Sequence, residues 1–301
     1  MRHFLLLAFP FVVACAASVS AGRGQQAAPG DDLVDAAGTD LGPIGSIKAL
    51  FQYRELIRNL VLKDLKLKYR GSVFGFLWSL LNPMVMMAVY LVAFRYIMAI
   101  RGQGFVFLLL LGILSWTFFS SSASMGAGAI VDNGGLLKTV HFPRAVLPLA
   151  SVLFNLAQYA LTILVFLPLM LVIYGKPPHA ALLLFPVFVV LQLMMTAGVA
   201  LALATGVAFF RDIRHLLEIA LMIMFWTTPI VYDYQAIPEA WRLPVLLSPM
   251  SPFVLAYQQI AYYGQVPDLR VWAAATVYAV VALCGGFALF IHLQHEFVEQ
   301  V

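Results

Sequence analysis

The stretch AVLPLASVLFNLAQYALTILVFLPLMLVIYG, residues 145–175, decides the fold class of this protein. It contains no Asp, Glu, Lys or Arg, and most of its side chains are aliphatic or aromatic. The hydrocarbon core of a bilayer is about 30 Å thick, so a helix that rises about 1.5 Å per residue crosses it in about 20 residues. The stretch therefore predicts one membrane-spanning helix.

Five further stretches predict membrane spans. Four of them are free of charge over a similar length, at residues 71–94, 102–131, 180–210 and 271–295. The fifth, residues 213–232, reaches spanning length if Glu218 lies near the membrane interface. Residues 243–267 are also free of charge, but their prolines predict short interfacial or re-entrant helices between the fifth and sixth spans. We therefore expect an all-α integral membrane protein with six transmembrane helices, and five or seven remain as alternatives.

The composition excludes a water-soluble globule. Hydrophobic residues make up 62% of the 301 residues and charged residues only 11%, whereas a soluble domain carries about 25% charged residues. A soluble enzyme, a disordered tail and a disulfide-rich secreted module are therefore excluded. The two cysteines, Cys15 and Cys284, are far apart and predict neither a disulfide framework nor a metal cluster. The net charge of +4 is small, and we expect no nucleic-acid partner.

The positive charges predict the orientation of the spans, because Lys and Arg gather on the cytoplasmic side of membrane proteins. Eleven of them lie before the first span, between the second and third spans, or between the fourth and fifth, and five lie in the other connections. Both ends of the six-span unit, residues 71–298, should therefore be cytoplasmic.

Residues 1–43 resemble a signal followed by a disordered extension. Residues 1–21 combine an early Arg, a short apolar run and small residues, which is typical of a secretory signal. Residues 22–43 are rich in Gly, Ala and Asp, as disordered segments are. Cleaved export would place the basic residues that follow outside the cell, against the charge distribution. A dispensable extension from an upstream start and a true signal or anchor are the two interpretations that remain.

Residues 44–70 predict an amphipathic cytoplasmic helix at the membrane interface. With about 100° between successive residues, charged side chains fall mostly on one side and a broad apolar face lies opposite. Such a helix lies flat on the membrane, with its cations toward the headgroups. Arg54, Arg58, Asp64 and Lys68 lie off the polar stripe and could instead contact a cytoplasmic partner.

Small residues on the fourth span predict close helix packing. Gly198, Ala202 and Gly206 recur every four residues and so lie on one face of the helix. Faces of this kind let two helix backbones approach closely in a membrane.

Several motifs resemble those of one transporter family. They read LKDLKLKYRGS at 62–72, FGFLWSLLNP at 74–83, FRDIRH at 210–215, TPIVY at 228–232, and Ser248-Pro249 followed by Ala256-Tyr257. Over roughly residues 45–298 the chain resembles the membrane subunit of ABC-2-type exporters, in the branch that moves O-antigen, capsule or teichoic-acid polymers. Lys63-Asp64 replaces the Arg-Asp that is more usual in the family, and Ser248-Pro249 replaces the usual Asn-Pro.

The resemblance implies a homodimer in the bacterial inner membrane that pairs with two copies of a separate ATPase. ATP and Mg²⁺ would bind the ATPase subunit, and this chain would carry no cofactor, no metal and no catalytic residue. Opening and closing driven by ATP would move a lipid-linked glycan to the outer leaflet. In the family, the loop between the second and third spans carries a coupling helix that docks on the ATPase. The expected coupling residues come from this loop and from the amphipathic helix: Arg54, Arg58, Lys63, Asp64, Leu136, Lys138, His141 and Arg144.

The residues themselves also indicate an external source of energy. A phosphate-binding loop needs the pattern G-x-x-x-x-G-K-[ST], and the nearest stretch, GGLLKT at 134–139, lacks the glycine before the lysine. Coupling to protons or sodium would usually place carboxylates within the membrane, but none of the 14 acidic residues lies in the middle of a predicted span. We therefore expect a partner ATPase to drive this chain.

Aromatic residues on the first and fifth spans are candidates for the translocation path. Sugars stack on aromatic faces, and a wall without fixed charges would let a polymer slide. These two spans, which line the dimer pathway in the family, offer Tyr90, Phe94, Trp226 and Tyr232. The alternative is an ordinary aromatic belt, since Trp and Tyr gather at membrane interfaces in any such protein.

The turn between the fourth and fifth spans has two interpretations. Its charged residues, Arg211, Asp212, Arg214 and Glu218, would form an ion-pair network that fixes the hairpin. Asp212, His215 and Glu218 could instead serve a membrane-embedded enzyme acting on a polyprenyl-linked substrate, but no other acid or base converges on them. An ABC-2 permease for a small molecule or lipid and a passive membrane scaffold are the remaining alternatives.

Overall fold

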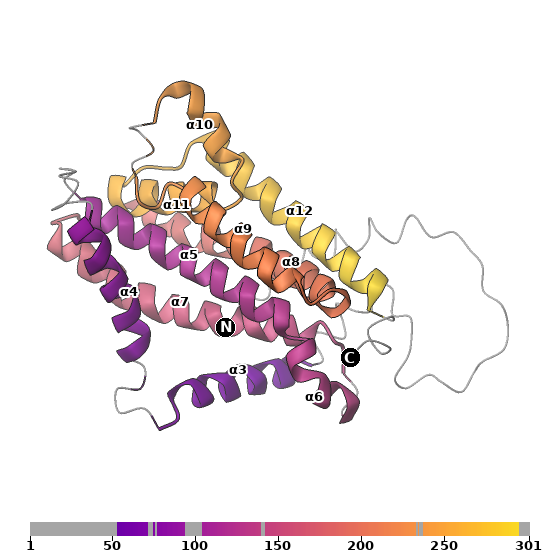
Figure 1. The fold of residues 1–301 in the computed structure, drawn as a ribbon. Coiled ribbons are helices and arrows are strands. Elements are labelled where there is room, and N and C mark those ends of the chain that lie inside the picture. The colour runs from indigo at the N-terminus through magenta and orange to yellow at the C-terminus, as the bar shows by residue number, and fades with distance from the viewer. Residues whose placement is uncertain are drawn as a thin grey trace.

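The computed structural model describes residues 53–71, 75, 77–93, 104–139, 142–232, 234 and 237–294. Within these residues every regular element is a helix, as predicted, and Figure 1 shows an inclined bundle with α3 on the outside of α7. The elements are α3 (Arg54–Tyr69), α4 (Leu77–Leu91), α5 (Phe105–Gly128), η2 (Val131–Asn133), α6 (Gly134–Thr139), α7 (Val146–Ile173), η3 (Ala180–Leu184), α8 (Phe185–Phe209), α9 (Ile213–Thr227), α10 (Glu239–Leu246), α11 (Ser251–Gln258), η5 (Gln259–Tyr263) and α12 (Leu269–Leu293). The predicted extension 1–43 and the first part of the amphipathic segment, residues 44–52, lie outside the described residues.

Four helical segments are long and apolar enough to cross a membrane: α5, α7, α12 and the combined η3–α8 segment, Ala180–Phe209. They correspond to four of the six predicted spans. α4 and α9 contain 15 residues each, which is about 22 Å of helix at about 1.5 Å per residue and less than the bilayer core. α9 ends at Thr227, before the predicted residue 232, because Pro229 has no backbone N–H with which to continue the helix.

The backbones of α8 and α12 are in direct contact. A Cβ atom on Gly198 would collide with the backbone of Ala282, and a Cβ atom on Gly286 would collide with the carbonyl group of Gly198. Only glycine fits at these two positions, and the predicted close packing at Gly198 is confirmed. Gly206, on the same helix, faces Ile213 at the start of α9, where an added Cβ would lie 2.8 Å from the Cδ1 atom of Ile213.

α11 is buried along its whole length, and buried polar groups join it to its neighbours. The Tyr257 hydroxyl donates a 2.7 Å hydrogen bond to the Gln192 side-chain oxygen on α8. The Gln192 amide nitrogen donates in turn to the carbonyl oxygen of Ser115 on α5, at 2.9 Å. The amide of Gln258 donates to the carbonyl oxygen of Pro229, at 3.2 Å. Since buried polar groups are costly when unpaired, these bonds fix the position of α11 relative to α5, α8 and the end of α9.

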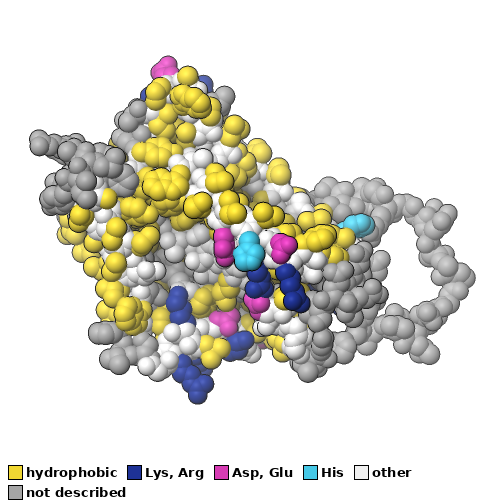
Figure 2. All heavy atoms as spheres, viewed as in Figure 1, with side chains coloured by type: hydrophobic (Ala, Val, Ile, Leu, Met, Phe, Trp, Pro, Cys, Tyr) yellow, Lys and Arg dark blue, Asp and Glu magenta, His cyan; other side chains and the backbone are white. Residues whose placement is uncertain are grey.

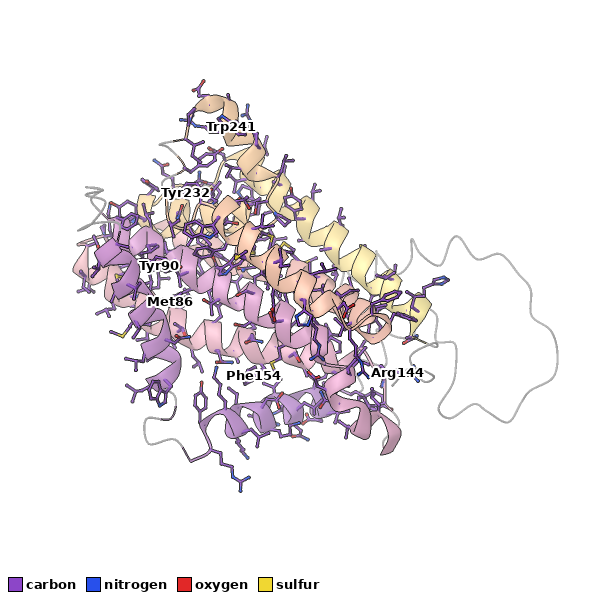
Figure 3. All side chains as sticks on the ribbon, viewed as in Figure 1. Met86, Tyr90, Arg144, Phe154, Tyr232 and Trp241 are labelled. Carbon is purple, nitrogen blue, oxygen red and sulfur yellow. The ribbon has the colours of Figure 1, made fainter. Side chains whose placement is uncertain are left out.

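α3 packs against α7 through one apolar side. Leu60 and Val61 are buried in a cluster with Val146, Ala150 and Phe154 of α7. At the far end of α3, the Lys68 ammonium donates to the Gln158 side chain and lies 5.7 Å from the centre of the Phe154 ring, which Figure 3 labels between the two helices. Removal from water lowers the pKa of Lys68 from its usual value. Lys68 therefore holds α3 to the bundle.

Charged side chains gather on one side of the molecule. Figure 2 shows Lys, Arg, Asp and Glu over α3 and around the turn that precedes α9, with a few more on α10. Apolar side chains cover most of the remaining described surface of this face. This distribution is typical of a membrane protein whose charged side faces water.

Candidate functional site

The structure forms a groove of about 380 Å³ between α4, α5 and α9. α4 contributes Asn82, Met86 and Tyr90, and Figure 3 labels the last two. α5 contributes Ile113, Trp116, Thr117 and Ser120. α9 contributes Leu221, Met222, Phe225 and Trp226. The groove therefore lies where the two short apolar helices meet the long helix α5.

Aromatic rings line the groove as one connected group centred on Phe225. The Tyr90 ring stacks on the Phe225 ring with centres 6.2 Å apart and planes 24° from parallel. Trp116 and Trp226 both meet Phe225 edge to face, at 5.6 Å and 5.5 Å. Such offset and edge-to-face pairs are the preferred geometries of aromatic rings and add to the energy of burial. α4, α5 and α9 thus each contribute aromatic rings to the surface of the groove.

The polar groups of the groove carry no formal charge. They are the side-chain amide of Asn82, the hydroxyl groups of Tyr90, Thr117 and Ser120, and the indole N–H groups of Trp116 and Trp226. The Thr117 hydroxyl donates to the carbonyl oxygen of Ile113 at 2.8 Å, which leaves its own oxygen able to accept a hydrogen bond. Aromatic faces beside uncharged hydrogen-bonding groups can contact the apolar faces and the hydroxyl groups of a sugar without holding it by a fixed charge.

Two of the four residues predicted for the translocation path line this groove. Tyr90 and Trp226 face it from α4 and α9, and the Trp226 side chain is 57% exposed. Tyr232 does not line it: it follows the end of α9, and its hydroxyl donates to the carbonyl oxygen of Thr227 at 2.9 Å. Phe94 lies outside the described residues.

Trp116 and Asn82 were not selected from the sequence. The signal for Trp116 is its four-residue spacing from Ser120, which places an aromatic and a hydroxyl side chain on one face of α5. The signal for Asn82 is a polar amide within an apolar helix. Neither signal shows which face of the helix lines a cavity.

The connection between α5 and α7 holds the predicted coupling residues. Leu136 on α6 is half-buried against the cluster formed by α3 and α7. Arg144 is also half-buried, and its guanidinium donates to the carbonyl oxygen of Gln294 at the end of α12. Burial lowers the pKa of Arg144 from its usual value. His141 and the side chain of Lys138 lie outside the described residues.

Arg54, Arg58 and Lys63, three of the predicted coupling residues of α3, lie on its exposed surface, whereas Asp64 is half-buried. Arg54 and Arg58 lie 4.0 Å and 3.5 Å from Glu55, and Lys63 lies 3.6 Å from Asp64. Exposed pairs of this kind contribute about 0–1 kcal/mol to stability. The three basic residues are therefore accessible to a partner and are not needed to hold α3 in place.

An ion pair that was not predicted joins the first turn of α9 to η2. Arg214 contacts Asp132 of η2 at 2.6 Å. This pair links α9 to the segment after α5, whereas the predicted network joined α8 to α9. Among the described residues, Arg211, Asp212 and Glu218 form no ion pair with each other or with Arg214.

The alternative of an embedded enzyme finds no support in the described residues. Asp212, His215 and Glu218 are exposed and none of them lines the groove. Within the described part of the chain, no group of three or more His, Cys, Asp or Glu residues could hold a metal ion.

A family model described as ABC-2 type transporter matches residues 55–262, which include α3, the groove helices and α11. The chain belongs to the ABC-2 type transporter family. This membership agrees with the four long apolar helices and makes the chain an integral membrane protein.

Relatives within this family have names that refer to glycan export. The chain is 38% identical, over 85% of its length and 98% of the relative's, to the O-antigen export system permease protein RfbA of Myxococcus xanthus. It is 29% identical to a protein of the same name from Klebsiella pneumoniae, over 83% of this chain and 95% of that one. It is 23% identical to the polysialic acid transport protein KpsM of Escherichia coli, over 78% of this chain and 92% of that one.

Proposed function

We propose that this chain is the membrane-spanning permease subunit of an ATP-driven exporter that moves a lipid-linked polysaccharide from the cytoplasm across the bacterial inner membrane. The observation that carries this proposal is the uncharged aromatic groove between α4, α5 and α9, in a chain whose relatives are named for O-antigen export and polysialic acid transport. The chain is a transport subunit and not an enzyme. ATP and Mg²⁺ bind a separate ATPase subunit.

In this proposal α4 and α9 are the first and fifth of six spans. Each is too short to cross the bilayer core alone, and residues next to each would complete the crossing. α10, α11 and η5 form the interfacial or re-entrant segment between the fifth and sixth spans. Both ends of the six-span unit, residues 71–298, lie in the cytoplasm, with α3 flat on the inner face of the membrane.

A second copy of this chain covers the apolar sides of α4 and α9. No residue of α9 is buried within one copy, and α4 exposes large apolar side chains such as Leu77, Trp78 and Val89. Large exposed apolar patches mark interaction surfaces. Association of two copies through these helices would bring two grooves together and enclose a path lined on both sides.

The ATPase docks on the charged side of the molecule, where α3 and α6 lie. Arg54, Arg58 and Lys63 provide an exposed basic surface on α3. α6 follows the end of α5, so a displacement of α6 acts directly on a helix that lines the groove.

The proposal is tested with the chain and its ATPase reconstituted in proteoliposomes. Trp226→Ala enlarges the groove and removes one aromatic face, and it should lower glycan export while ATP hydrolysis continues. The control is Trp241→Ala, because Trp241 on α10 is similarly exposed, at 65%, but does not line the groove. Wild-type export of a small amphiphile without export of glycan would overturn the proposal in favour of the other ABC-2 substrate class.

A further inference from the structure

The ion pair between Asp132 and Arg214 lies directly over Gly128, where a side chain would occupy the space of the two charged groups. Arg214 Nη2 lies 2.6 Å from Asp132 Oδ1, and the two residues are 82 positions apart in the chain. A Cβ atom on Gly128, the last residue of α5, would collide with Asp132 Oδ2 and lie 2.9 Å from Arg214 Nη2. The absence of a side chain at Gly128 therefore lets the two charged groups meet over the end of α5.

The two partners belong to segments with different tasks in the proposed function. Asp132 lies in η2, immediately before α6, which is the segment proposed to contact the ATPase. Arg214 is in the first turn of α9, and the groove residues Leu221 to Trp226 follow on the same helix. At about 1.5 Å per residue, Trp226 lies about 18 Å further along the helix axis than Arg214. One ion pair thus joins the docking segment to a wall of the groove.

α9 packs through half-buried side chains, and its far end is held by the rings around Phe225 and by hydrogen bonds of the segment that follows it. None of its residues is buried. Its first residue, Ile213, packs close to Gly206 of α8 and gives a fixed point beside Arg214. A displacement of Asp132 therefore pulls on the first turn of α9 next to this contact, and a tilt of the helix would move the side chains that α9 places in the groove.

The ion pair contributes little to the stability of the fold, so its role is to transmit movement from one segment to another. The Arg214 and Asp132 side chains are 40% and 58% exposed, and exposed pairs contribute about 0–1 kcal/mol. We propose that the Asp132–Arg214 ion pair transmits the movement of α6 to α9 and so changes the width of the groove. This inference rests on the proposed function. It makes Asp132, Arg214 and Gly128 positioning residues for export.

The test compares export with ATP hydrolysis in proteoliposomes that contain the chain and its ATPase. Asp132→Asn and Arg214→Gln each remove one charge, and Gly128→Ala keeps both charges but forces the two charged groups out of their present positions. Losing an interaction worth at most about 1 kcal/mol changes a ratio by at most about fivefold. We therefore expect each variant to assemble, to retain ATP hydrolysis and to export about two- to fivefold less glycan per ATP. The exchange Asp132→Arg with Arg214→Asp should restore the ratio.

Two controls match these changes in chemistry. Glu239→Gln removes a different exposed carboxylate–guanidinium pair, which joins Glu239 to Arg242 at 3.6 Å on α10. Gly285→Ala adds a methyl group on α12 where no atom lies within 4 Å of it. Both controls should keep the wild-type ratio of export to ATP hydrolysis.

The possible results separate the inference from the proposed function. No glycan export by the wild-type complex would refute the proposed function itself. Wild-type export with an unchanged ratio in Asp132→Asn, Arg214→Gln and Gly128→Ala would overturn the inference alone. A parallel fall of export and ATP hydrolysis would also overturn it, because it would show a structural role. If the charge exchange does not assemble, Gly128→Ala still decides, since it alters neither charge.

Discussion

Removing the hydroxyl group of Tyr257 tests whether the buried polar chain holds α11. Tyr257 is fully buried, and its hydroxyl donates at 2.7 Å to Gln192. Tyr257→Phe leaves the Gln192 oxygen buried without a donor. Leaving one buried polar group unpaired costs about 1–3 kcal/mol. For a chain of this size, about 1 kcal/mol lowers the melting temperature by about 2–4 °C, so we expect a loss of about 2–12 °C.

The matched double variant gives the sharper result. Gln192→Met alone removes the acceptor that lies 2.7 Å from the Tyr257 hydroxyl and should also lower the melting temperature. The Ser115 carbonyl that Gln192 also contacts lies within α5, where helical hydrogen bonding already uses it. Replacing both partners by apolar groups removes the unpaired groups, so Tyr257→Phe with Gln192→Met should lose less than either single variant.

The assay is the apparent melting temperature of the purified chain in lipid nanodiscs. Tyr232→Phe is the control. Tyr232 is half-buried, and its hydroxyl donates a 2.9 Å hydrogen bond to the carbonyl oxygen of Thr227, which is exposed and can bind water when the donor is removed. This control should shift the melting temperature by less than Tyr257→Phe does. A double variant whose loss equals the sum of the two single losses would refute the reasoning about unpaired groups.

Three further changes test the packing of the bundle. Gly198→Val places a branched side chain against the backbone of α12, where overpacking costs about 1–3 kcal/mol or more, and the yield of folded protein should fall sharply while Gly285→Ala has no effect. Lys68→Met removes the contacts of α3 with Gln158 and Phe154 and lowers the free energy that holds α3 to the bundle by about 0.5–1 kcal/mol. Proteolysis of α3 should therefore be faster, and unchanged cleavage would contradict this. Gly104→Ala meets both a φ of +82° and the Tyr262 ring, so its melting temperature should fall by several degrees, about 1–3 kcal/mol.

Much of the helical architecture follows from the sequence, because a long apolar run has few other stable states in a membrane. The charge-free stretches predicted α5, α7, α8 and α12 to within a few residues, and spacing alone predicted the close contact at Gly198. Pro229 also predicts the early end of α9, because a residue without a backbone N–H cannot continue the helix.

The site was predictable only in part. Tyr90 and Trp226 could be selected because their helices were assigned to the path by family resemblance. The rotation of α5, which turns Trp116 into the groove, depends on packing with two other helices and leaves no trace in the local sequence. The same holds for Asp132 and Arg214, whose pairing over 82 residues needs the three-dimensional arrangement.

The contact between Gly198 and Gly286 limits where this transporter can change shape. At Gly198 and Gly286, α8 and α12 meet backbone to backbone, so at this crossing no side chain lies between them that could be compressed or repacked during a cycle. Any alternation between inward-facing and outward-facing states must therefore use the interfaces where side chains separate the helices. The α8–α12 pair would act as the stationary frame, and α4 and α9 would supply the moving parts.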